Sequence, residues 1–389
     1  MKAIYNAKVI TNHGTLVSHA VVFTDKVIAV VPDNELESFV VQERIDANGN
    51  YVAPGFIDIH VHGCAGADTM DEDDGALDII SENLVRTGVT AFLPTTMTMP
   101  FDSIEYILER IRSKIGQGNG AEIVGCHLEG PFINKEYKGA QDKTYMLNPD
   151  FSKIRDYADV IKIATIAPEL PGSLEFVRQA VADGIIVSIG HSAATYDRAM
   201  TAIKMGASHI THTFNALGAL NHRQPGVIGA LADSNVTCDL IADNIHVHPA
   251  VQRLLLKLTG PEKLILVSDA MRATLMKDGE YDLGGQKVFV KNGEARMENG
   301  ALAGSVLTLG NAVANFIATS GLALSEVIKM VSLNPARRLG IADRKGAIEA
   351  GKDADLVVLD DNLEVAMTVA RGQTVYRRYH IENCNCQGL

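Results

Sequence analysis

The feature that most constrains this fold is a rhythm in the middle of the chain: a short apolar run, a polar residue at its end, then a longer helical pattern. β-Branched residues and Leu fill the runs without strict alternation, which is typical of parallel strands covered on both faces. Eight strands alternating with helices predict an α/β fold of the TIM type, a (β/α)8 barrel. The eight runs are Phe56–His62, Val89–Thr95, Ile123–Glu129, Ile161–Ala167, Ile185–His191, His209–His212, Thr237–Ala242 and Leu264–Asp269.

The two ends of the chain have a different pattern. Residues 3–10 and 20–31 are rich in β-forming residues, and so are Ala354–Asp360 and Glu364–Tyr376. Neither end alternates strands with helices, and neither could bury an apolar face alone. We therefore expect the two ends to meet and form one small β-sandwich beside the barrel.

This pattern divides the chain into two predicted domains. Residues 1–51 and 345–389 form the small β-sandwich domain, and residues 52–344 form the barrel domain. Within the barrel domain, Gly279–Gly300 contains two glycine-bearing turns and predicts a hairpin inserted after the eighth strand.

Composition narrows the function. An apolar fraction of 47% is ample for a large core, and the formal charge of −12 argues against nucleic acid or an anionic membrane as partner. A small anionic substrate stays possible. The longest uncharged stretch, Asn299–Ser325, is interrupted by Gly and Asn and favours a packed helix over a membrane span. No secretory signal is evident at the N-terminus, and five cysteines are few and odd in number, so we expect a cytoplasmic protein with reduced thiols.

The strongest local signal lies on the first strand. Side chains alternate along a strand, so Asp58, His60 and His62 share one face. Neutral imidazoles are good ligands for Zn, Fe and related ions, and a nearby carboxylate can orient a ring. Two hydrogen-bonded core histidines are the alternative that this strand alone leaves open.

Other strand ends favour the metal. Glu129, His191, His212 and Asp269 end the third, fifth, sixth and eighth runs. Active sites of such barrels lie at the carboxyl ends of their strands. So many ligand-type side chains from separate strand ends predict a metal centre on one rim.

At this point the chain resembles the amidohydrolase superfamily and, within it, the N-acetylglucosamine-6-phosphate deacetylases. The resemblance extends from residue 54 to residue 360, and the combination of HLEGP, LAGS and the Arg-x-Pro-Gly stretch is its most specific part. The matching stretches are PGFIDIHVHG, GVTAFLPTT, HLEGPFI, GHSAAT, THTFNA, HRQPGVIGA, SDA, LAGS and GAIEAGKDADLVVLD.

The resemblance implies a divalent metal, Zn or Fe, with one or two ions per subunit. Glu129, His191 and His212 are implied to bind one ion, and His60 and His62 a second, with Glu129 bridging. Asp269 is implied to touch a metal as well. A carboxylated Lys on the fourth strand bridges the metals of many other amidohydrolases, but Lys162, the only candidate, lies at the wrong end of its strand.

The implied reaction is metal-dependent deacetylation of N-acetylglucosamine 6-phosphate to glucosamine 6-phosphate and acetate, as in amino-sugar catabolism. A metal-activated hydroxide attacks the amide, and Asp269 serves as the general base and then the general acid. The alternative for Asp269 is a helix N-cap.

Several further residues resemble the family's substrate contacts. His246 matches the histidine that stabilises the oxyanion or binds the sugar, although His248 shares its parity. Arg223 matches a phosphate anchor that reaches the neighbouring subunit's site, which implies a homodimer. The remaining implied substrate-binding residues are Gln141, Asn215, Ala216 and Leu302, the last lining the acetyl pocket.

Alternative functions stay open from sequence. They are an N-acetylgalactosamine-6-phosphate deacetylase, another amidohydrolase acting on cyclic amides, and a non-catalytic scaffold of the same fold. The pattern does not determine the native metal or the occupancy of both positions. Three features have no assigned function: His127, read as a satisfied core histidine; Cys64, read as a buried thiol; and the Cys384 and Cys386 tail.

Overall fold

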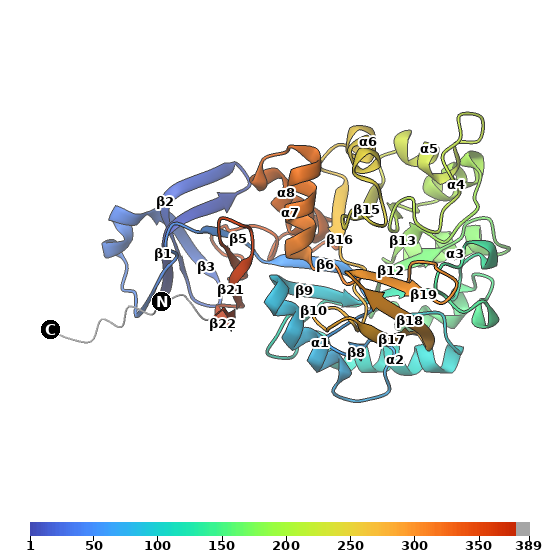
Figure 1. The fold of residues 1–389 in the computed structure, drawn as a ribbon, viewed down its shortest axis with the longest axis horizontal. Helices are drawn as coiled ribbons and strands as arrows, with labels where there is room; N and C mark the ends of the chain where they lie inside the picture. Colours follow the sequence, from blue (N-terminus) through green and yellow to red (C-terminus); the bar gives the residue numbers. More distant parts are fainter. Residues whose placement is uncertain (379–389) are drawn as a thin grey trace.

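The computed structural model describes residues 1–378 and consists of a barrel joined to a sheet built from both chain ends (Figure 1). Parallel strands alternate with helices through the barrel, as the eight apolar runs predict. The barrel strands are β6 (Phe56–Val61), β9 (Val89–Pro94), β10 (Glu122–Ile123), β11 (Cys126–Glu129), β12 (Ile161–Ile166), β13 (Ile186–Ile189), β14 (His209–Ile210), β15 (Thr237–Ile241) and β16 (Leu264–Val267).

The third predicted strand is two strands in the structure. β10 pairs with β9 and β11 pairs with β12, with a break between them at Gly125. Gly125 has a φ of 145°, and a Cβ there would lie 2.8 Å from the Val160 carbonyl oxygen. The glycine therefore permits a local break in the strand, after which the chain pairs with β12 while the His127 carbonyl oxygen still accepts the Thr96 amide N–H at 3.0 Å on the β9 side.

The barrel closes between its last and first strands. The amide N–H groups of His62 and Gly63 donate to the carbonyl oxygen of Ala270 at 2.8 and 2.9 Å. The amide of Asp269 donates to the carbonyl oxygen of His60 at 3.0 Å. These bonds confirm the barrel and bring the first and eighth strand ends side by side.

Helices pack around the strands because each buries an apolar stripe against them. In α2, for example, Ile104, Ile107, Leu108 and Ile111 are buried at helical spacing. The α-helices are α1 (Ala76–Leu84), α2 (Phe101–Lys114), α3 (Ser173–Ala182), α4 (Tyr196–Lys204), α5 (Gly226–Ala232), α6 (Pro249–Thr259), α7 (Leu309–Ser320), α8 (Leu324–Val331) and α9 (Leu333–Arg338). The short 3-10 helices are η1 (Asp33–Ser38), η2 (Val85–Thr87), η3 (Lys135–Tyr137), η4 (Lys143–Tyr145), η5 (Phe151–Lys153) and η6 (Arg155–Tyr157).

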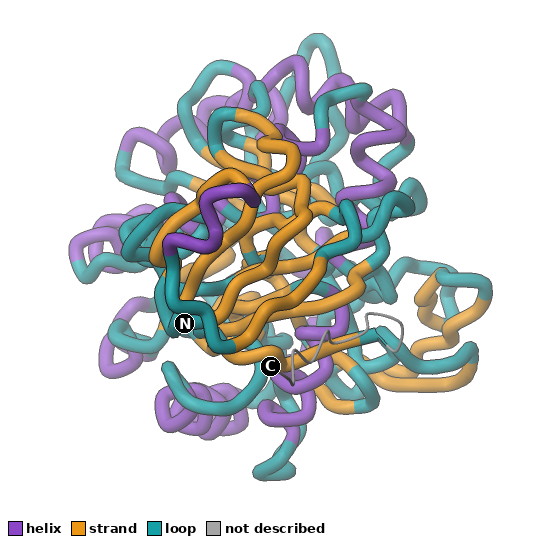
Figure 2. The backbone as a smooth tube through the Cα atoms, turned by 90° about the vertical axis from the view of Figure 1, so that its left-hand side faces the viewer, coloured by secondary structure: helices purple, strands orange, loops and turns teal. Residues whose placement is uncertain are grey.

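The two chain ends do meet in one sheet, with strand order β22-β21-β20-β5-β1-β2-β3 and β4 beside β1. Its apolar interior draws residues from both ends, including Phe23, Val52 and Met367. Figure 2, with this end toward the viewer, shows the sheet in front of the barrel helices. The strands are β1 (Lys2–Thr11), β2 (Gly14–Phe23), β3 (Val27–Pro32), β4 (Glu43–Asp46), β5 (Tyr51–Pro54), β20 (Leu356–Leu359), β21 (Val365–Ala370) and β22 (Gln373–Arg377).

Strand β5 pairs with β1 from the N-terminal end and with β20 from the C-terminal end. It straddles the predicted limit at residue 51, and the domain limits stay predictions. The predicted insertion is present as a three-stranded antiparallel sheet of β17 (Gly279–Leu283), β18 (Gln286–Lys291) and β19 (Glu294–Met297). A further short pair, β7 (Gly63–Cys64) and β8 (Ala67–Asp68), follows the first barrel strand.

A buried ionic cluster connects the barrel to the end sheet. The Lys345 ammonium lies 2.5 Å from Asp355, 2.9 Å from Glu122 and 3.1 Å from Asp353. Arg344 also pairs with Glu122 and Asp353, at 2.6 and 2.9 Å. Glu122 begins β10, so the cluster lies at the amino-terminal end of the barrel. We call these five residues, together with Lys26, whose ammonium lies 2.5 Å from Asp353, the ionic cluster.

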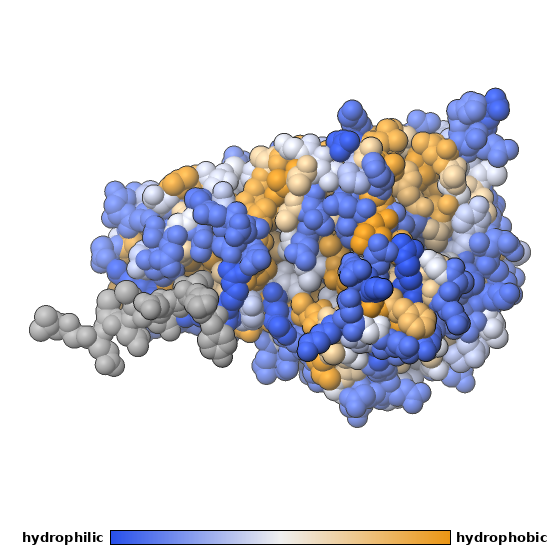
Figure 3. All heavy atoms as spheres, in the orientation of Figure 1, coloured by the Kyte–Doolittle hydropathy of each residue, from blue (hydrophilic) through white to orange (hydrophobic). Residues whose placement is uncertain are grey.

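The outer surface of the face in view is largely hydrophilic, with hydrophobic side chains gathered over α7, α8 and α6 (Figure 3). Among residues 1–378, none of the helices has both the length and the apolar character needed to cross a membrane. The predicted helix within Asn299–Ser325 is the 12-residue α7, packed on the barrel.

Candidate metal centre and substrate pocket

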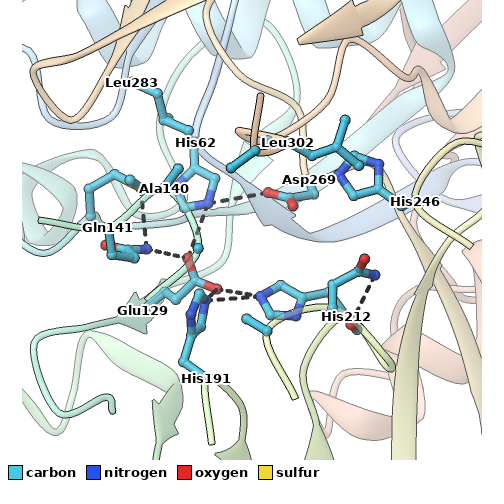
Figure 4. A pocket seen from close by; sticks show the side chains of 16 residues that line it. His62, Glu129, Ala140, Gln141, His191, His212, His246, Asp269, Leu283 and Leu302 are labelled. Atoms are coloured by element: carbon cyan, nitrogen blue, oxygen red, sulfur yellow. Dashed lines mark hydrogen bonds and ion pairs between the residues drawn. The ribbon is translucent and has the colours of Figure 1, made fainter. Parts of the chain in front are cut away.

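The predicted ligand residues converge on the carboxyl-terminal rim of the barrel, and Figure 4 shows all of them except His60. They lie in, or within two residues of the end of, β6, β11, β13, β14 and β16. They form two groups, each with ligand atoms within 4.8 Å of one another. The first group is His60, His62 and Asp269, and the second is Glu129, His191 and His212.

In the first group the imidazole Nε2 atoms of His60 and His62 lie 3.2 Å apart. Oδ1 of Asp269 lies 3.5 Å from Nε2 of His60 and 3.3 Å from Nε2 of His62. Asp269 is only 7% exposed, so this carboxylate faces the imidazoles with little water around it.

The second group has the same arrangement. The Nε2 atoms of His191 and His212 lie 3.1 Å apart, and Oε1 of Glu129 lies 3.2 Å from the first and 3.0 Å from the second. All three side chains are nearly inaccessible to solvent.

Glu129 lies between the two groups. Its Oε1 atom is 3.4 Å from Nε2 of His60, and its Oε2 atom is 3.3 Å from Nε2 of His62. One carboxylate therefore reaches both groups at once. This geometry suits a ligand shared by two cations.

Backbone carbonyls fix the orientation of one imidazole in each group. Nδ1 of His62 lies 3.2 Å from the Thr95 carbonyl oxygen, and Nδ1 of His191 lies 2.8 Å from that of Tyr137. A carbonyl only accepts, so each Nδ1 carries the proton and each neutral ring directs an Nε2 lone pair into the rim. Lone pairs and carboxylate oxygens at these separations repel one another unless positive charge lies between them. The donor set therefore fits divalent cations held through imidazole and carboxylate.

The pKa shifts indicate the same demand for positive charge. Burial would lower the pKa of His62, but Asp269 and Glu129 raise it to about 10, so a proton binds at the position of Nε2 that a cation would otherwise take, and the ring is neutral only when a cation replaces that proton. Burial would raise the pKa of the Glu129 carboxyl, but the surrounding histidines hold it well below its usual range. The carboxylates are thus stabilised as anions and draw positive charge toward them.

Backbone conformation at the strand ends places these ligands. His191, His212 and Asp269 have φ values of 46°, 28° and 50°, in the left-handed region that non-glycine residues rarely adopt. Each residue directly follows or lies near the end of a strand, where the chain turns away. Such strain concentrates at functional sites, and nothing in the residue types predicts it.

A pocket opens beside the two groups. Five of the six implied substrate-binding residues line it, which are Gln141, Asn215, Ala216, His246 and Leu302. Six further lining residues were not expected from sequence: Met97, Gly139, Ala140, Leu283, Ala301 and Gly304. Leu283 ends β17 and Ala301 follows β19, so the inserted sheet forms one wall. Gly304 lies within the LAGS stretch, Gly139–Ala140 are next to Gln141 and Ala301 is next to Leu302, whereas no sequence signal marks Met97 or Leu283.

Gln141 has a defined orientation in this pocket. Its Oε1 atom accepts the Thr98 amide N–H at 2.6 Å, and its Nε2 atom donates to Oε2 of Glu129 at 2.7 Å. With 2% of its surface exposed, Gln141 supports the shared carboxylate in addition to lining the pocket.

From the sequence, either His246 or His248 could be the substrate-binding histidine, and the structure places only His246 in the pocket lining. His246 lines the pocket, with Nδ1 2.6 Å from Oδ2 of Asp243. His248 is the N-cap of α6, where its Nδ1 accepts the amide N–H of Ala250 at 3.2 Å. Asp243 is a partner that sequence analysis missed, although it lies only three residues before His246.

Arg223 is the implied substrate residue that the single chain does not bring to the pocket. It lies in an exposed loop, where its amide N–H donates to Oδ1 of Asn221 at 3.0 Å. Its implied target is the site of a second subunit, so this placement leaves its role a prediction.

Two other polar residues, Asp58 and His127, have structural partners. Asp58 accepts the amide N–H groups of His60 and Ser268, both at 3.3 Å, so it supports backbone and does not orient a metal-facing ring as its shared face had suggested. His127 is held by the Ile59 carbonyl oxygen at 2.9 Å and by Oγ1 of Thr165 at 2.7 Å. His127 is therefore a satisfied core histidine, as expected.

Cys64 is buried, and burial raises its pKa to about 12, so it remains an inert thiol. The Cys384 and Cys386 tail lies outside the described residues. Nζ of Lys162 lies 3.2 Å from the Asp159 carbonyl oxygen, away from the rim, so a carboxylated lysine does not serve as the bridge.

Comparisons with known proteins agree with this geometry. The profile of the amidohydrolase family matches residues 51–375. The N-acetylglucosamine-6-phosphate deacetylase of Bacillus subtilis (strain 168) is 42% identical over 83% of this chain and 84% of its own. The N-acetylgalactosamine-6-phosphate deacetylase of Escherichia coli O157:H7 is 36% identical over 94% of this chain and 97% of its own.

A solved structure is similar along nearly the whole chain. It is a single-residue mutant of the N-acetyl-D-glucosamine-6-phosphate deacetylase from Mycobacterium smegmatis, in complex with N-acetyl-D-glucosamine-6-phosphate. It has a TM-score of 0.88 and 32% identity, covering 96% of this chain and 99% of that one. The barrel, the two ligand groups and these matches together show that the chain belongs to the amidohydrolase family.

Proposed function

We propose that this protein hydrolyses the acetamide of N-acetylglucosamine 6-phosphate to glucosamine 6-phosphate and acetate. The observation that carries the proposal is the position of Glu129, shared by two groups of metal-type ligands beside a pocket that the family's substrate residues line. The likeness to deacetylases of this substrate, at up to 42% identity among those compared above, supports the choice of substrate.

Asp269 is the proposed proton carrier. Burial would raise the pKa of its carboxyl, but His60 and His62 lower it to about 2, so it is an anion at neutral pH. It borders the pocket and lies against the first ligand group. An ionised carboxylate there takes a proton from the attacking water and returns it to the departing amine nitrogen. Its left-handed backbone and rim contacts fit this role better than the helix N-cap alternative.

The proposed cofactor is a divalent metal, Zn or Fe, at one or two ions per subunit: Glu129, His191 and His212 would hold one ion, and His60, His62 and Asp269 would hold a second, with Glu129 in reach of both groups. Such an ion polarises an amide carbonyl and lowers the pKa of a bound water. His60, His62, His191 and His212 supply the neutral imidazoles, and Glu129 and Asp269 supply the negative charge.

The pocket walls divide between apolar and polar side chains. Leu302, with Leu283 and Met97, offers apolar surface of the kind that an acetyl methyl group needs. His246 and Asn215 offer polar atoms for the sugar hydroxyls and the carbonyl oxygen, and Gln141 adds a third polar side chain. Ala216, with a φ of 50°, brings backbone close to the same space.

Arg223 is the proposed phosphate anchor, acting across a homodimer at the partner's pocket. Its exposed loop position supports a task outside its own subunit. A guanidinium fork matches phosphate oxygens in pairs. We also propose that the protein is cytoplasmic and binds neither nucleic acid nor membrane, in line with its charge of −12.

The deciding experiment measures kcat/KM of the metal-loaded protein on N-acetylglucosamine 6-phosphate and on N-acetylglucosamine. The phosphorylated sugar should be favoured about ten- to a hundredfold, because a charge-assisted contact contributes about 1.5–3 kcal/mol. Equal values for the two sugars would remove the phosphosugar assignment, and no hydrolysis of either would favour the scaffold.

Arg223→Met tests the anchor separately. KM for the phosphorylated sugar should rise about ten- to hundredfold with kcat nearly unchanged. Arg253→Met, on the exposed face of α6, is the matched control and should leave KM unchanged. Unchanged saturation in the Arg223 variant would remove the anchor role.

The galactosamine epimer is the second candidate, because the E. coli O157:H7 N-acetylgalactosamine-6-phosphate deacetylase matches 94% of this chain. Competition between the two phosphorylated epimers in one assay measures the preference directly. A kcat/KM ratio above about ten for the galacto epimer would reassign the substrate.

A further inference from the structure

Asp243 does not line the pocket, but its carboxylate contacts the pocket residue His246. It lies two residues past β15, in the loop that leads to His246. Its side chain is 9% exposed and that of His246 is 7% exposed. A buried carboxylate and a buried imidazole 2.6 Å apart form a short charge-assisted hydrogen bond at the pocket wall.

The two carboxylate oxygens of Asp243 have separate roles. Oδ1 accepts the amide N–H groups of Ile245 and His246, both at 2.8 Å. Oδ2 is opposite Nδ1 of His246. The backbone bonds fix the rotation of the carboxylate, so Oδ2 has one direction in which to accept, and Nδ1 must carry a proton.

The opposite ring atom, Nε2, is then the one that serves the pocket. His246 lines that pocket beside Asp269 and Leu302 (Figure 4). With Nδ1 protonated, a neutral ring presents Nε2 as an acceptor only. The ring donates from Nε2 only as an imidazolium, and this form needs a nearby negative charge.

Asp243 supplies that charge. Burial would raise the pKa of its carboxyl, but the hydrogen bond and the charge of His246 lower it below its usual value. An ionised carboxylate at Nδ1 stabilises an imidazolium without having to become protonated itself.

Resting on the proposed function, we infer that Asp243 is a positioning residue that holds His246 with its proton on Nδ1. The imidazolium form of His246 then donates a hydrogen bond from Nε2 to the acetyl carbonyl oxygen as negative charge develops on that oxygen. The inference takes the acetyl oxygen rather than a sugar hydroxyl as the acceptor, because only that oxygen gains the negative charge that a cationic ring stabilises. No covalent bond to the protein forms, and the proton stays on His246.

Asp243→Asn tests the inference sharply because Oδ1 can keep both backbone bonds. The amide nitrogen then occupies the position of Oδ2 and donates to Nδ1, which forces the neutral tautomer with the proton on Nε2. A donor still faces the substrate, but its positive charge is lost. We expect kcat to fall about a hundredfold while KM changes less than about threefold.

A double-mutant cycle separates this role from a structural one. His246→Ala should lower kcat by at least as much as Asp243→Asn, and Asp243→Asn should add little in the His246→Ala background. Asp233→Asn is the matched control, because this exposed carboxylate accepts a hydrogen bond from Tyr196 outside the pocket and an amide oxygen can replace it. Its kcat and KM should equal those of the unmodified protein.

Nitrogen-15 NMR of the zinc-loaded protein tests the pairing independently of activity. His246 should show a protonated Nδ1 in the unmodified protein and a protonated Nε2 in Asp243→Asn. An unchanged tautomer, additive losses in the cycle, or a raised KM with unchanged kcat would each overturn the inference. If the protein fails to hydrolyse the phosphorylated sugar while the tautomers switch as expected, the proposed function falls and the Asp243–His246 pairing stands.

Discussion

Two polar clusters lie at opposite ends of the barrel, and they differ in how their buried carboxylates are neutralised. At the amino-terminal end, Lys345 and its partners match every carboxylate with a fixed basic side chain. At the carboxyl-terminal rim, Glu129 and Asp269 face imidazoles, and the described pocket lining holds no Lys or Arg. Carboxylates are costly to bury in either place unless positive charge accompanies them.

The difference separates a structural cluster from a functional one. In the ionic cluster, three basic residues oppose Glu122, Asp353 and Asp355, so its charge is balanced by the chain itself. The rim has neutral imidazoles in the equivalent role, and these bind cations reversibly. A cluster balanced by its own basic side chains stabilises the fold, whereas a cluster of imidazoles and carboxylates is suited to bind a cation and the chemistry that the cation supplies.

Of the changes that distinguish the two clusters, removing the cation should have the largest effect on activity. Dialysis against a chelator should lower kcat/KM at least about a thousandfold, because several kcal/mol of charge stabilisation is lost, and added Zn or Fe should restore it. The ionic cluster needs no ion, so circular dichroism should show the fold retained. Full activity with less than about a tenth of an ion per chain, measured by elemental analysis, would contradict the metal centre.

Asp269→Asn should have the next largest effect. The amide keeps a ligand oxygen but cannot accept a proton, so kcat should fall about 10²- to 10⁴-fold while bound metal stays the same. Steady-state kinetics with elemental analysis of the same sample check both parts. Near-normal turnover would show that another group carries the proton.

Lys345→Met probes the self-balanced cluster. The side chain is 1% exposed, and removing it leaves three carboxylates with two cations, so the free energy of unfolding should fall by about 3–5 kcal/mol. Urea unfolding measures this loss, and kcat of the folded variant should stay within about twofold. Lys8→Met, which removes a surface pair with Asp361, is the control and should barely change stability. A loss of activity without a loss of stability would contradict the division of roles.

The smallest expected effect is the acid dependence of that cluster. Burial would raise the pKa of Asp353, but Lys26, Lys345 and Arg344 lower it to about 2 from its usual 3.8. Because the folded pKa is the lower one, Asp353 stabilises the fold above pH 3.8, and this contribution disappears as the pH falls toward 2. Allowing for solvent screening, Asp353→Asn should reduce the acid-dependent stability by about 1–2 kcal/mol. If the unmodified protein and Asp353→Asn show equal slopes of unfolding free energy against pH between about pH 4 and 2, this role of Asp353 is contradicted.

Much of the rim could be predicted because its residues are placed by local sequence patterns. Parallel strands with buried faces predict the barrel, and the alternation along β6 puts His60 and His62 on one side. Residues at strand ends then have only one rim to meet on. The predicted ligands therefore converge, and Gln141, His246 and Leu302 line the adjoining pocket.

Other features depend on contacts between distant segments or on backbone conformation. The break at Gly125 follows from the positions of Val160 and Lys162 on the neighbouring strand. Asp58 shares the face of the histidines but accepts a hydrogen bond from the backbone of Ser268, directly after β16. The position of Arg223 in an exposed loop leaves its task to be decided by a second chain.

From its sequence alone this chain determines which residue types stand at the ends of its strands, because periodicity and strand order are properties of the chain itself. Tertiary structure alone decides which of them share an ion, as Glu129 reaches both ligand groups only when β6, β11, β13 and β14 curve into one rim. It also decides which charges are already neutralised, since Glu122 and Lys345 are far apart in sequence and meet only in the folded barrel. Coulomb interactions depend on distance in space, and the chain's order does not specify that distance.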